Sequence, residues 1–401
     1  MQVRVIQHPV GQGGLLSGEL TVGDATLRWL YDCGSNQAYD LTREISQVVD
    51  GRDIDLLFLS HLDSDHVSGV DQLLRQANVG HVILPYLNEL DLKLTVCRDL
   101  ELGVLNSSFL AFAEAPEEWF LGRGVGAVTF VRPVGDGDPS SSGTPELPPL
   151  SDKPRDFDGF KVESLEPMWI VQGRKPTKQR IGLVNRMNNS AVVGCFVNAQ
   201  LQNWVLSPYA HRPSVVGVRK FQNELRAVFG RAASLAQIIA ASRTSIGRSR
   251  LKRCYGAIWS DHNLVSMSLY SGPFRASSSP TARLSRRKRW KIKLVENAFG
   301  WLSTGDANLS GIRRRTAFLQ HYESFLEYTG VLVAPHHGAA SSFHPDFPKK
   351  FPNLALGIAA AGKNSYGHPH KVVSHAFKLS CGSFWKVSSA LASGVILDHR
   401  E

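Results

Sequence analysis

The chain has 401 residues, of which 43% are hydrophobic, so it can bury a sizeable core as one large domain with insertions or as two domains. Its formal net charge of +10 favours polyanionic partners, such as nucleic acid or a membrane surface. Five scattered cysteines without a Cys-x-x-Cys pair exclude a disulfide framework and a zinc ribbon.

The chain shows no sign of a membrane or secretory segment. No apolar run approaches the ~18–20 residues of a membrane span. Residues 1–14 lack the long apolar core of a signal peptide. Together with the cysteine pattern, this predicts a soluble, cytoplasmic chain with no membrane span, for which protein partners remain open.

The first elements are predicted to be strands. Residues 3–10 alternate like an edge strand, 11–14 form a glycine turn, and 15–22 return as the second arm of a hairpin. Residues 25–31 form a further strand that ends at Asp32, and residues 39–49 fit a helix that covers the sheet.

A dense group of polar side chains follows the mostly apolar run 54–59, which predicts a short buried strand. His61, Asp63, Asp65 and His66 lie within six residues of one another, at the junction between this strand and a helical pattern. Imidazole and carboxylate together suit Zn, Mn or Fe. The alternative is a solvated loop, but four such residues directly after a buried strand favour a metal site.

The middle of the chain is harder to interpret. Residues 81–85 predict a strand and 90–110 a helix, so the pattern is of the α/β class. Residues 135–156 are rich in Pro, Gly and Ser and predict a loop. Residues 214–246 are mostly helical in pattern.

A basic run lies between residues 283 and 293. Clustered Lys and Arg neutralise phosphates, and an aromatic side chain can stack on a base. The run therefore predicts contact with DNA or RNA, and the alternative is a solvated loop. The predicted nucleic-acid-binding residues are Arg286, Arg287, Lys288, Arg289 and Trp290.

Three further motifs lie near the C-terminal end. Residues 300–304 form a strand that ends at Gly305 and Asp306, and the apolar run 330–335 leads directly to His336 and His337. The third motif is Tyr-Gly-His-Pro, with His368 as its histidine.

The ordered set of motifs resembles the metallo-β-lactamase superfamily. His61-x-Asp63-x-Asp65-His66 has Asp63 where the superfamily has its second His, a variant similar to the hydrolase domain of ComEC-type competence DNA-uptake proteins. The resemblance implies an αββα sandwich with a large insertion. We therefore predict an N-terminal half at residues 1–95, an insertion-rich, partly helical segment at 96–260, and a C-terminal half at 261–401.

The resemblance also implies a binuclear metal centre. It would hold two divalent ions, Zn²⁺ or Mn²⁺, with Asp63 shifting the preference somewhat towards Mn²⁺. Asp306 would bridge the ions, and Asp32 would orient a ligand, unless it only forms an Asx-turn. Asp65 and His368 would take part in catalysis. The implied ligands are His61, Asp63, Asp65, His66, Asp306 and one of His336 and His337; the other would orient a ligand or contact the scissile group.

The implied activity is hydrolysis by a metal-activated hydroxide. A phosphodiesterase or nuclease acting on DNA or RNA agrees with the basic charge. One alternative is a small-molecule hydrolase of lactams, thioesters or cyclic nucleotides, because the same fold supports many substrates. Another is a metal-binding component of a multi-protein defence or uptake system.

Overall fold

The computed structural model describes most of the chain. Of the predicted nucleic-acid-binding residues, Arg287, Lys288, Arg289, Trp290 and the side chain of Arg286 lie outside the described part. The described residues are 1–86, 88–103, 105, 107–133, 164–165, 168–172, 183–188, 192–197, 200–211, 215–230, 233–256, 266–277, 281–286 and 291–401.

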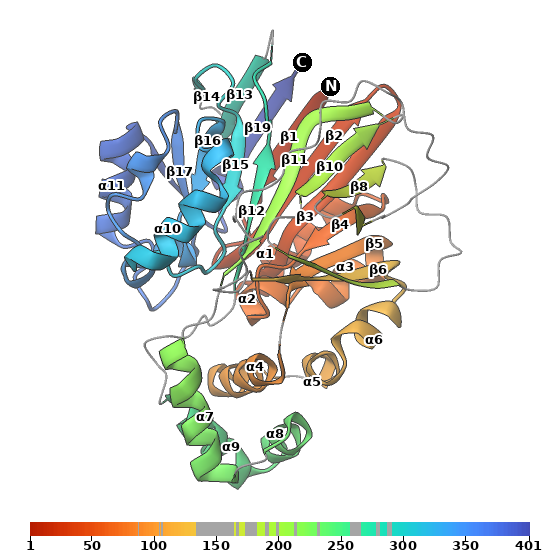
Figure 1. The fold of residues 1–401 in the computed structure, drawn as a ribbon, viewed down its shortest axis with the longest axis vertical. Helices are drawn as coiled ribbons and strands as arrows, with labels where there is room; N and C mark the ends of the chain where they lie inside the picture. The colour runs from red at the N-terminus through yellow and green to blue at the C-terminus, as the bar shows by residue number, and fades with distance from the viewer. Residues whose placement is uncertain are drawn as a thin grey trace.

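Two sheets form the centre of the molecule (Figure 1). The first sheet has the order β14 (Lys291–Ile292), β13 (Thr281–Arg286), β19 (Val395–Arg400), β1 (Gln2–Gln7), β2 (Gly13–Val22), β3 (Ala25–Ser35), β4 (Ile54–Phe58), β5 (Val79–Pro85), β6 (Ala127–Arg132) and β9 (Leu183–Asn188). The second has the order β18 (Phe384–Val387), β17 (Leu356–Ala360), β16 (Thr329–Val333), β15 (Gly300–Ser303), β12 (Met267–Gly272), β11 (Gln200–Ala210), β10 (Val192–Val197), β8 (Met168–Gln172) and β7 (Ser164–Leu165).

The two sheets pack face to face around one apolar layer. Trp29 and Phe58 of the first sheet and Trp204 and Trp301 of the second belong to the same buried cluster. Each of these side chains has less than 1% of its surface exposed. Alternating inward-facing apolar residues therefore hold the sheets together, as in other face-to-face sheet packings.

Helices cover the outer faces of both sheets and complete the sandwich. The amphipathic helices α1 (Ala38–Val49) and α3 (Val70–Gln76) pack their apolar sides on the first sheet. On the second sheet lie α10 (Ile312–His321) and α11 (Lys371–Cys381), whose buried residues join a separate apolar cluster. The predicted α/β class and the αββα sandwich with an insertion are thus confirmed.

The prediction that residues 3–10 form an edge strand is wrong. β1 pairs with β2 on one side and with β19 on the other, both antiparallel. An alternating pattern reports one buried face but not the number of neighbouring strands. The partner comes from the last residues of the described chain, which no local pattern reveals.

Residues 96–260 contribute to both sheets and also form helices outside them. The helix predicted over residues 90–110 is two helices, α4 (Glu89–Leu102) and α5 (Ser107–Glu114), because Gly103 ends α4 in a left-handed conformation with φ of 72°. Then come α6 (Pro116–Leu121), α7 (Val215–Phe229), α8 (Leu235–Ser242) and α9 (Ser245–Gly256). The division at residues 95 and 260 stays a prediction.

Four of these helices pack together below the sheets in Figure 1. α4 packs against α8 and α9, and α7 packs against α9. We call α4, α7, α8 and α9 the helical cap. Apolar residues on one side of each cap helix, such as Phe221 and Leu251, are buried in the cluster that also contains residues of α1 and α3.

None of the helices in the described part of the chain is long and apolar enough to cross a membrane.

Candidate metal centre

The candidate ligands lie where parallel strands of the two sheets end. β3, β4 and β5 run parallel in the first sheet, and β15, β16 and β17 run parallel in the second. His61 and the short helix α2 (Ser64–Val67) follow β4, Asp306 follows β15, and His336 follows β16. Because the carboxyl ends of parallel strands meet at one edge of a sheet, residues far apart in sequence converge there.

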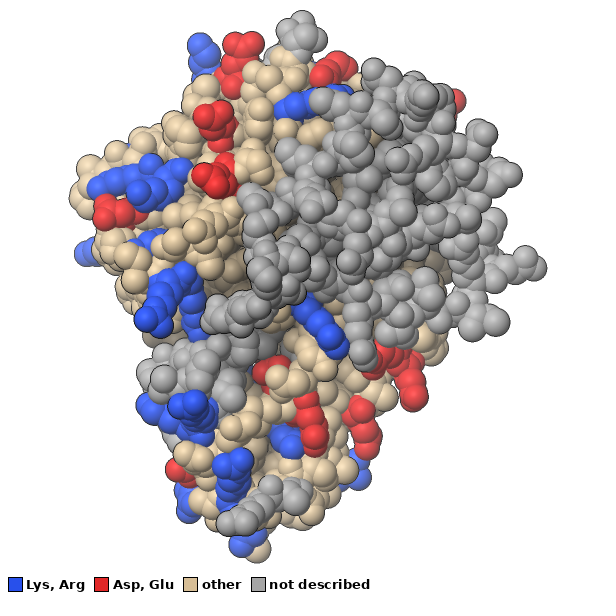
Figure 2. Space-filling model, in the orientation of Figure 1, with Lys and Arg blue, Asp and Glu red and all other residues tan. Residues whose placement is uncertain are grey.

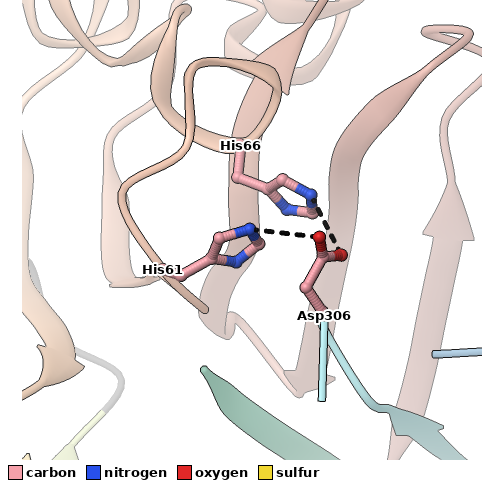
Figure 3. Close-up of side chains that lie close together, drawn as sticks. All are labelled: His61, His66 and Asp306. Atoms are coloured by element: carbon pink, nitrogen blue, oxygen red, sulfur yellow. Dashed lines mark ion pairs between the residues drawn. The ribbon is translucent and has the colours of Figure 1, made fainter. Parts of the chain in front are cut away.

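Asp306 is the centre of the arrangement (Figure 3). Its Oδ2 lies 3.5 Å from His61 Nε2 and 3.5 Å from His336 Nε2. Its Oδ1 lies 3.6 Å from His66 Nε2 and 3.7 Å from His337 Nε2. Each carboxylate oxygen thus faces two imidazoles, which is the geometry that a carboxylate bridging two cations requires.

Two overlapping ligand sets result. Asp65 Oδ2 lies 3.1 Å from His337 Nε2 and 4.0 Å from His66 Nε2. One ligand atom each from Asp65, His66 and His337 lies within 4.8 Å of the others, and the same holds for His61, His66 and Asp306. The structure therefore brings together the seven predicted ligands, and both His336 and His337 lie beside Asp306.

Hydrogen bonds on the far side of the rings leave the Nε2 atoms available to a metal. His66 Nδ1 lies 2.8 Å from Asp32 Oδ2, and His337 Nδ1 lies 2.8 Å from the Ala360 carbonyl oxygen. Both partners only accept hydrogen bonds, so each Nδ1 carries the proton. His61 Nδ1 bonds to Ser60 Oγ, whose own proton goes to Asp32. In the neutral rings, Nε2 is then the lone-pair atom, as metal ligation needs.

These tautomers place lone-pair atoms close to one another and to a carboxylate, and a cation between them would make these contacts favourable. His66 Nε2 and His337 Nε2 face each other at 3.3 Å, and His61 Nε2 faces Asp63 Oδ2 at 2.8 Å. Without a cation between them, these contacts would oppose lone pairs or negative charge at short range. His61 Nε2 is buried and makes no hydrogen bond to the described residues. The donor set thus fits divalent metal ions.

Protonation can supply the positive charge when no metal is bound. Burial acts to lower the pKa of His337, but the carboxylates of Asp306 and Asp65 outweigh it and raise the pKa to about 9. Conversely, burial acts to raise the pKa of Asp306, whereas His336, His61 and His337 hold it well below its usual range. A metal ion would therefore displace protons as it binds.

Backbone strain is concentrated at this centre. Asp32, His336 and His337 have φ values of 61°, 49° and 54°, and they are three of the five non-glycine residues with positive φ in the described part of the chain. Such conformations cost free energy and persist where the surroundings enforce them. Close packing around Asp32 is one such constraint. A Cβ atom added to Gly14 would lie only 2.8 Å from Cβ of Asp32 and 3.1 Å from His66 Nδ1, so the backbone of Gly14 packs directly against these side chains.

Asp32 lies where the sequence predicted a residue that orients a ligand. Besides His66, it accepts hydrogen bonds from the Ser60 backbone N–H at 2.6 Å and from Ser60 Oγ at 2.8 Å. Sequence reasoning missed Ser60, which links Asp32 to His61, because a serine before a histidine carries no distinctive signal.

We expect Asp32→Asn to weaken metal binding by about 10–100-fold, because the amide no longer holds the Nδ1 proton of His66 as a carboxylate does. Titration of the metal-free protein with Zn²⁺ or Mn²⁺ measures this effect. Asp71→Asn is the control, because Asp71 is half-buried on α3 and pairs with Arg123. Equal affinities of Asp32→Asn and wild type would show that Asp32 has no such role.

Arg98 is the second residue that sequence reasoning missed. It projects from α4 of the helical cap and forms an ion pair with Asp63 Oδ2. Its side chain is 13% exposed. No motif marks an arginine in the middle of a helix, so this contact emerges only from the tertiary structure. The ion pair between Arg98 and Asp63 therefore connects the cap to the candidate metal centre.

His368 lies beside the centre, outside both ligand sets. Its ring centroid is 5.5 Å from that of His336 and 5.6 Å from that of Tyr366. Burial, and then the charges of His336 and His337, lower its pKa to about 4. It is therefore neutral at ordinary pH and placed at the border of the centre.

Part of the chain matches a known protein family. The model of the metallo-beta-lactamase superfamily matches residues 22–168, which contain Asp32 and the His61–His66 motif. No curated protein matches the chain. The crystal structure of the metallo-beta-lactamase fold protein YhfI from Bacillus subtilis aligns over 99% of this chain and 99% of that chain, with 9% identity and a TM-score of 0.38. Residues 22–168 are thus similar to the metallo-beta-lactamase superfamily, and the two facing sheets with outer helices form an αββα sandwich.

Proposed function

We propose that the chain is a binuclear metal-dependent phosphodiesterase that acts on DNA or RNA. The observation that carries this proposal is the position of Asp306, whose two oxygens each face two imidazole Nε2 atoms. A carboxylate so placed could hold two cations together. The proposed ions are Zn²⁺ or Mn²⁺, because the ligands are imidazoles and carboxylates without sulfur.

The proposed ligands divide into two groups around Asp306. His61, Asp63 and His336 lie on its Oδ2 side, and Asp65, His66 and His337 lie on its Oδ1 side. When bound, divalent ions lower the pKa of water and polarise the scissile group. Asp32, Ser60 and the Ala360 carbonyl hold the Nδ1 protons and so fix the ring orientations.

His368 and Asp65 have proposed roles in the reaction itself. His368 lies next to His336 at the border of the centre, and its low pKa keeps it neutral, so its ring can donate one hydrogen bond to a negatively charged oxygen of the substrate. Asp65 adds a carboxylate beside His337, where it can orient a water by accepting a hydrogen bond.

The charge of the molecule supports a polyanionic substrate. The net charge of +10 attracts phosphodiesters over long range. Arg98 adds a guanidinium at the centre, a group that suits phosphate oxygens. The resemblance of the motif order to the ComEC-type hydrolase domain also supports a nucleic-acid substrate. The run from Arg286 to Trp290 remains a predicted contact.

Substrate profiling of the metal-reconstituted protein tests the proposal. We expect hydrolysis of bis(p-nitrophenyl) phosphate and of DNA or RNA, linear or circular, that disappears on chelation and returns with Zn²⁺ or Mn²⁺. The comparison substrates are a β-lactam, a thioester and a cyclic nucleotide. Turnover of one of these, without any cleavage of nucleic acid or of the chromogenic diester, would contradict the proposal.

A further inference from the structure

We infer that the helical cap is the surface that binds the nucleic-acid backbone and presents it to the metal centre. The inference rests on the proposed function for its substrate class, but its evidence comes from different residues. It assigns to α7 and α9 the sequence-independent binding of phosphates, and to Arg98 of α4 the contact nearest the scissile phosphate.

The part of the cap formed by α7, α8 and α9 is strongly basic. Within residues 215–230 and 233–256 there are eight Lys and Arg residues and one acidic residue, Glu224. All eight basic side chains are exposed. They are Arg219, Lys220, Arg226, Arg243, Arg248, Arg250, Lys252 and Arg253.

The structure explains why these charges face outward. Phe221 and Leu225 of α7, Ile238 of α8, and Leu251 and Cys254 of α9 are buried in the apolar cluster of the cap and first sheet. The basic residues between them in sequence therefore occupy the opposite, solvent-exposed sides of the helices. Figure 2 shows Lys and Arg side chains over the part of the molecule where Figure 1 places α7 and α9, with acidic side chains further to the right.

Few carboxylates of the described part of the chain neutralise this surface. Lys252 Nζ lies 3.4 Å from Glu101, and Arg253 Nε lies 3.9 Å from Glu224. Both contacts are at exposed positions, where ion pairs contribute little. The positive potential of the surface therefore persists, and it matches the phosphate backbone in charge.

Two contacts link the helices of the basic surface to the metal centre. α9 packs on α4, and α4 carries Arg98 to Asp63. Tyr255, near the C-terminal end of α9, is buried in the same apolar cluster as the other inward-facing cap residues. A bound strand on the cap would thus be next to the residues that border the centre.

Neutralising the cap tests this inference without touching the centre. The cap variant replaces Arg219, Lys220, Arg248 and Arg250 with Gln, which keeps helix propensity and removes charge. The control variant makes the same change of charge at exposed residues outside the cap, Arg75, Arg313, Lys350 and Lys378. Binding of labelled single-stranded DNA, RNA and duplex DNA is measured in EDTA over a range of salt concentrations, so that no cleavage is needed.

We expect the cap variant to bind all three nucleic acids at least about tenfold more weakly than the control variant. Its log–log salt slope should be flatter by about 0.7–0.9 for each phosphate contact removed. The loss should be alike for all sequences, because phosphate contacts carry no sequence information. Hydrolysis of bis(p-nitrophenyl) phosphate should stay at the wild-type rate, and circular dichroism should confirm that the variant is folded.

Equal slopes for the cap and control variants would overturn the inference. So would a cap variant that loses binding to phosphatidylglycerol vesicles but not to nucleic acid, since the surface would then be a membrane contact. The two proposals can fail separately. Wild-type protein that binds nucleic acid through the cap but hydrolyses no phosphodiester would leave the cap assignment standing and contradict the proposed function.

Discussion

Asp306→Asn is expected to abolish hydrolysis while leaving the fold intact. The side chain keeps its shape, but one carboxylate oxygen becomes an amide that only donates hydrogen bonds. In the metal-free protein that amide can donate to imidazole Nε2 atoms, so the buried site remains satisfied. It cannot join two cations, and we expect a loss of turnover of at least about 10²–10³-fold.

The measurements for Asp306→Asn are turnover of the chromogenic diester, metal content and circular dichroism. Asp71→Asn is the control, because Asp71 pairs with Arg123 on α3, away from the ligand sets. A folded Asp306→Asn protein whose turnover stays within about threefold of wild type would have lost less than about 1 kcal/mol of barrier lowering. Asp306 would then not be a bridging ligand.

Sequence reasoning located the candidate centre because chemistry-bearing residues follow buried strands. His61, Asp306 and His337 each come three or four residues after the end of a buried strand, and the apolar runs predict strands whose ends can converge. The ligand types themselves indicate metal. What the sequence cannot state is which atom faces which, and so whether His336, His337 or both take part. That depends on the left-handed backbone at both residues.

Long-range contacts explain the other differences between the sequence-based predictions and the structure. β19 joins β1 across nearly the whole chain, and Arg98 meets Asp63 only because α4 packs against the metal-binding loop. Neither contact leaves a local pattern. The basic surface of the cap can be predicted only in part. The charges of residues 248–253 are visible in the sequence, but their position in the tertiary structure is not. Amphipathic helices predict a buried side without identifying what buries it.

Asp65→Ala is expected to remove one metal ion from the centre. Asp65 Oδ2 lies 3.1 Å from His337 Nε2 and is the carboxylate on the side of Asp306 that faces His66 and His337. Without it, that side would retain two imidazoles and Oδ1 of Asp306 as possible ligands. Wild-type protein should bind about two divalent ions per chain and the variant about one. Elemental analysis after dialysis measures the content, with Asp71→Ala as the control.

A second readout for Asp65→Ala needs no metal. In the metal-free protein the carboxylates of Asp306 and Asp65 raise the pKa of His337 to about 9 against the opposing effect of burial. Without the Asp65 carboxylate the imidazolium form of His337 is stabilised less, so the pKa of His337 should fall in the variant. NMR titration of the ring measures this change. Equal metal content in wild type and Asp65→Ala would exclude Asp65 as a ligand. An unchanged pKa of His337 would contradict the contact between Asp65 and His337. The candidate ligand set of Asp65, His66 and His337 depends on that contact.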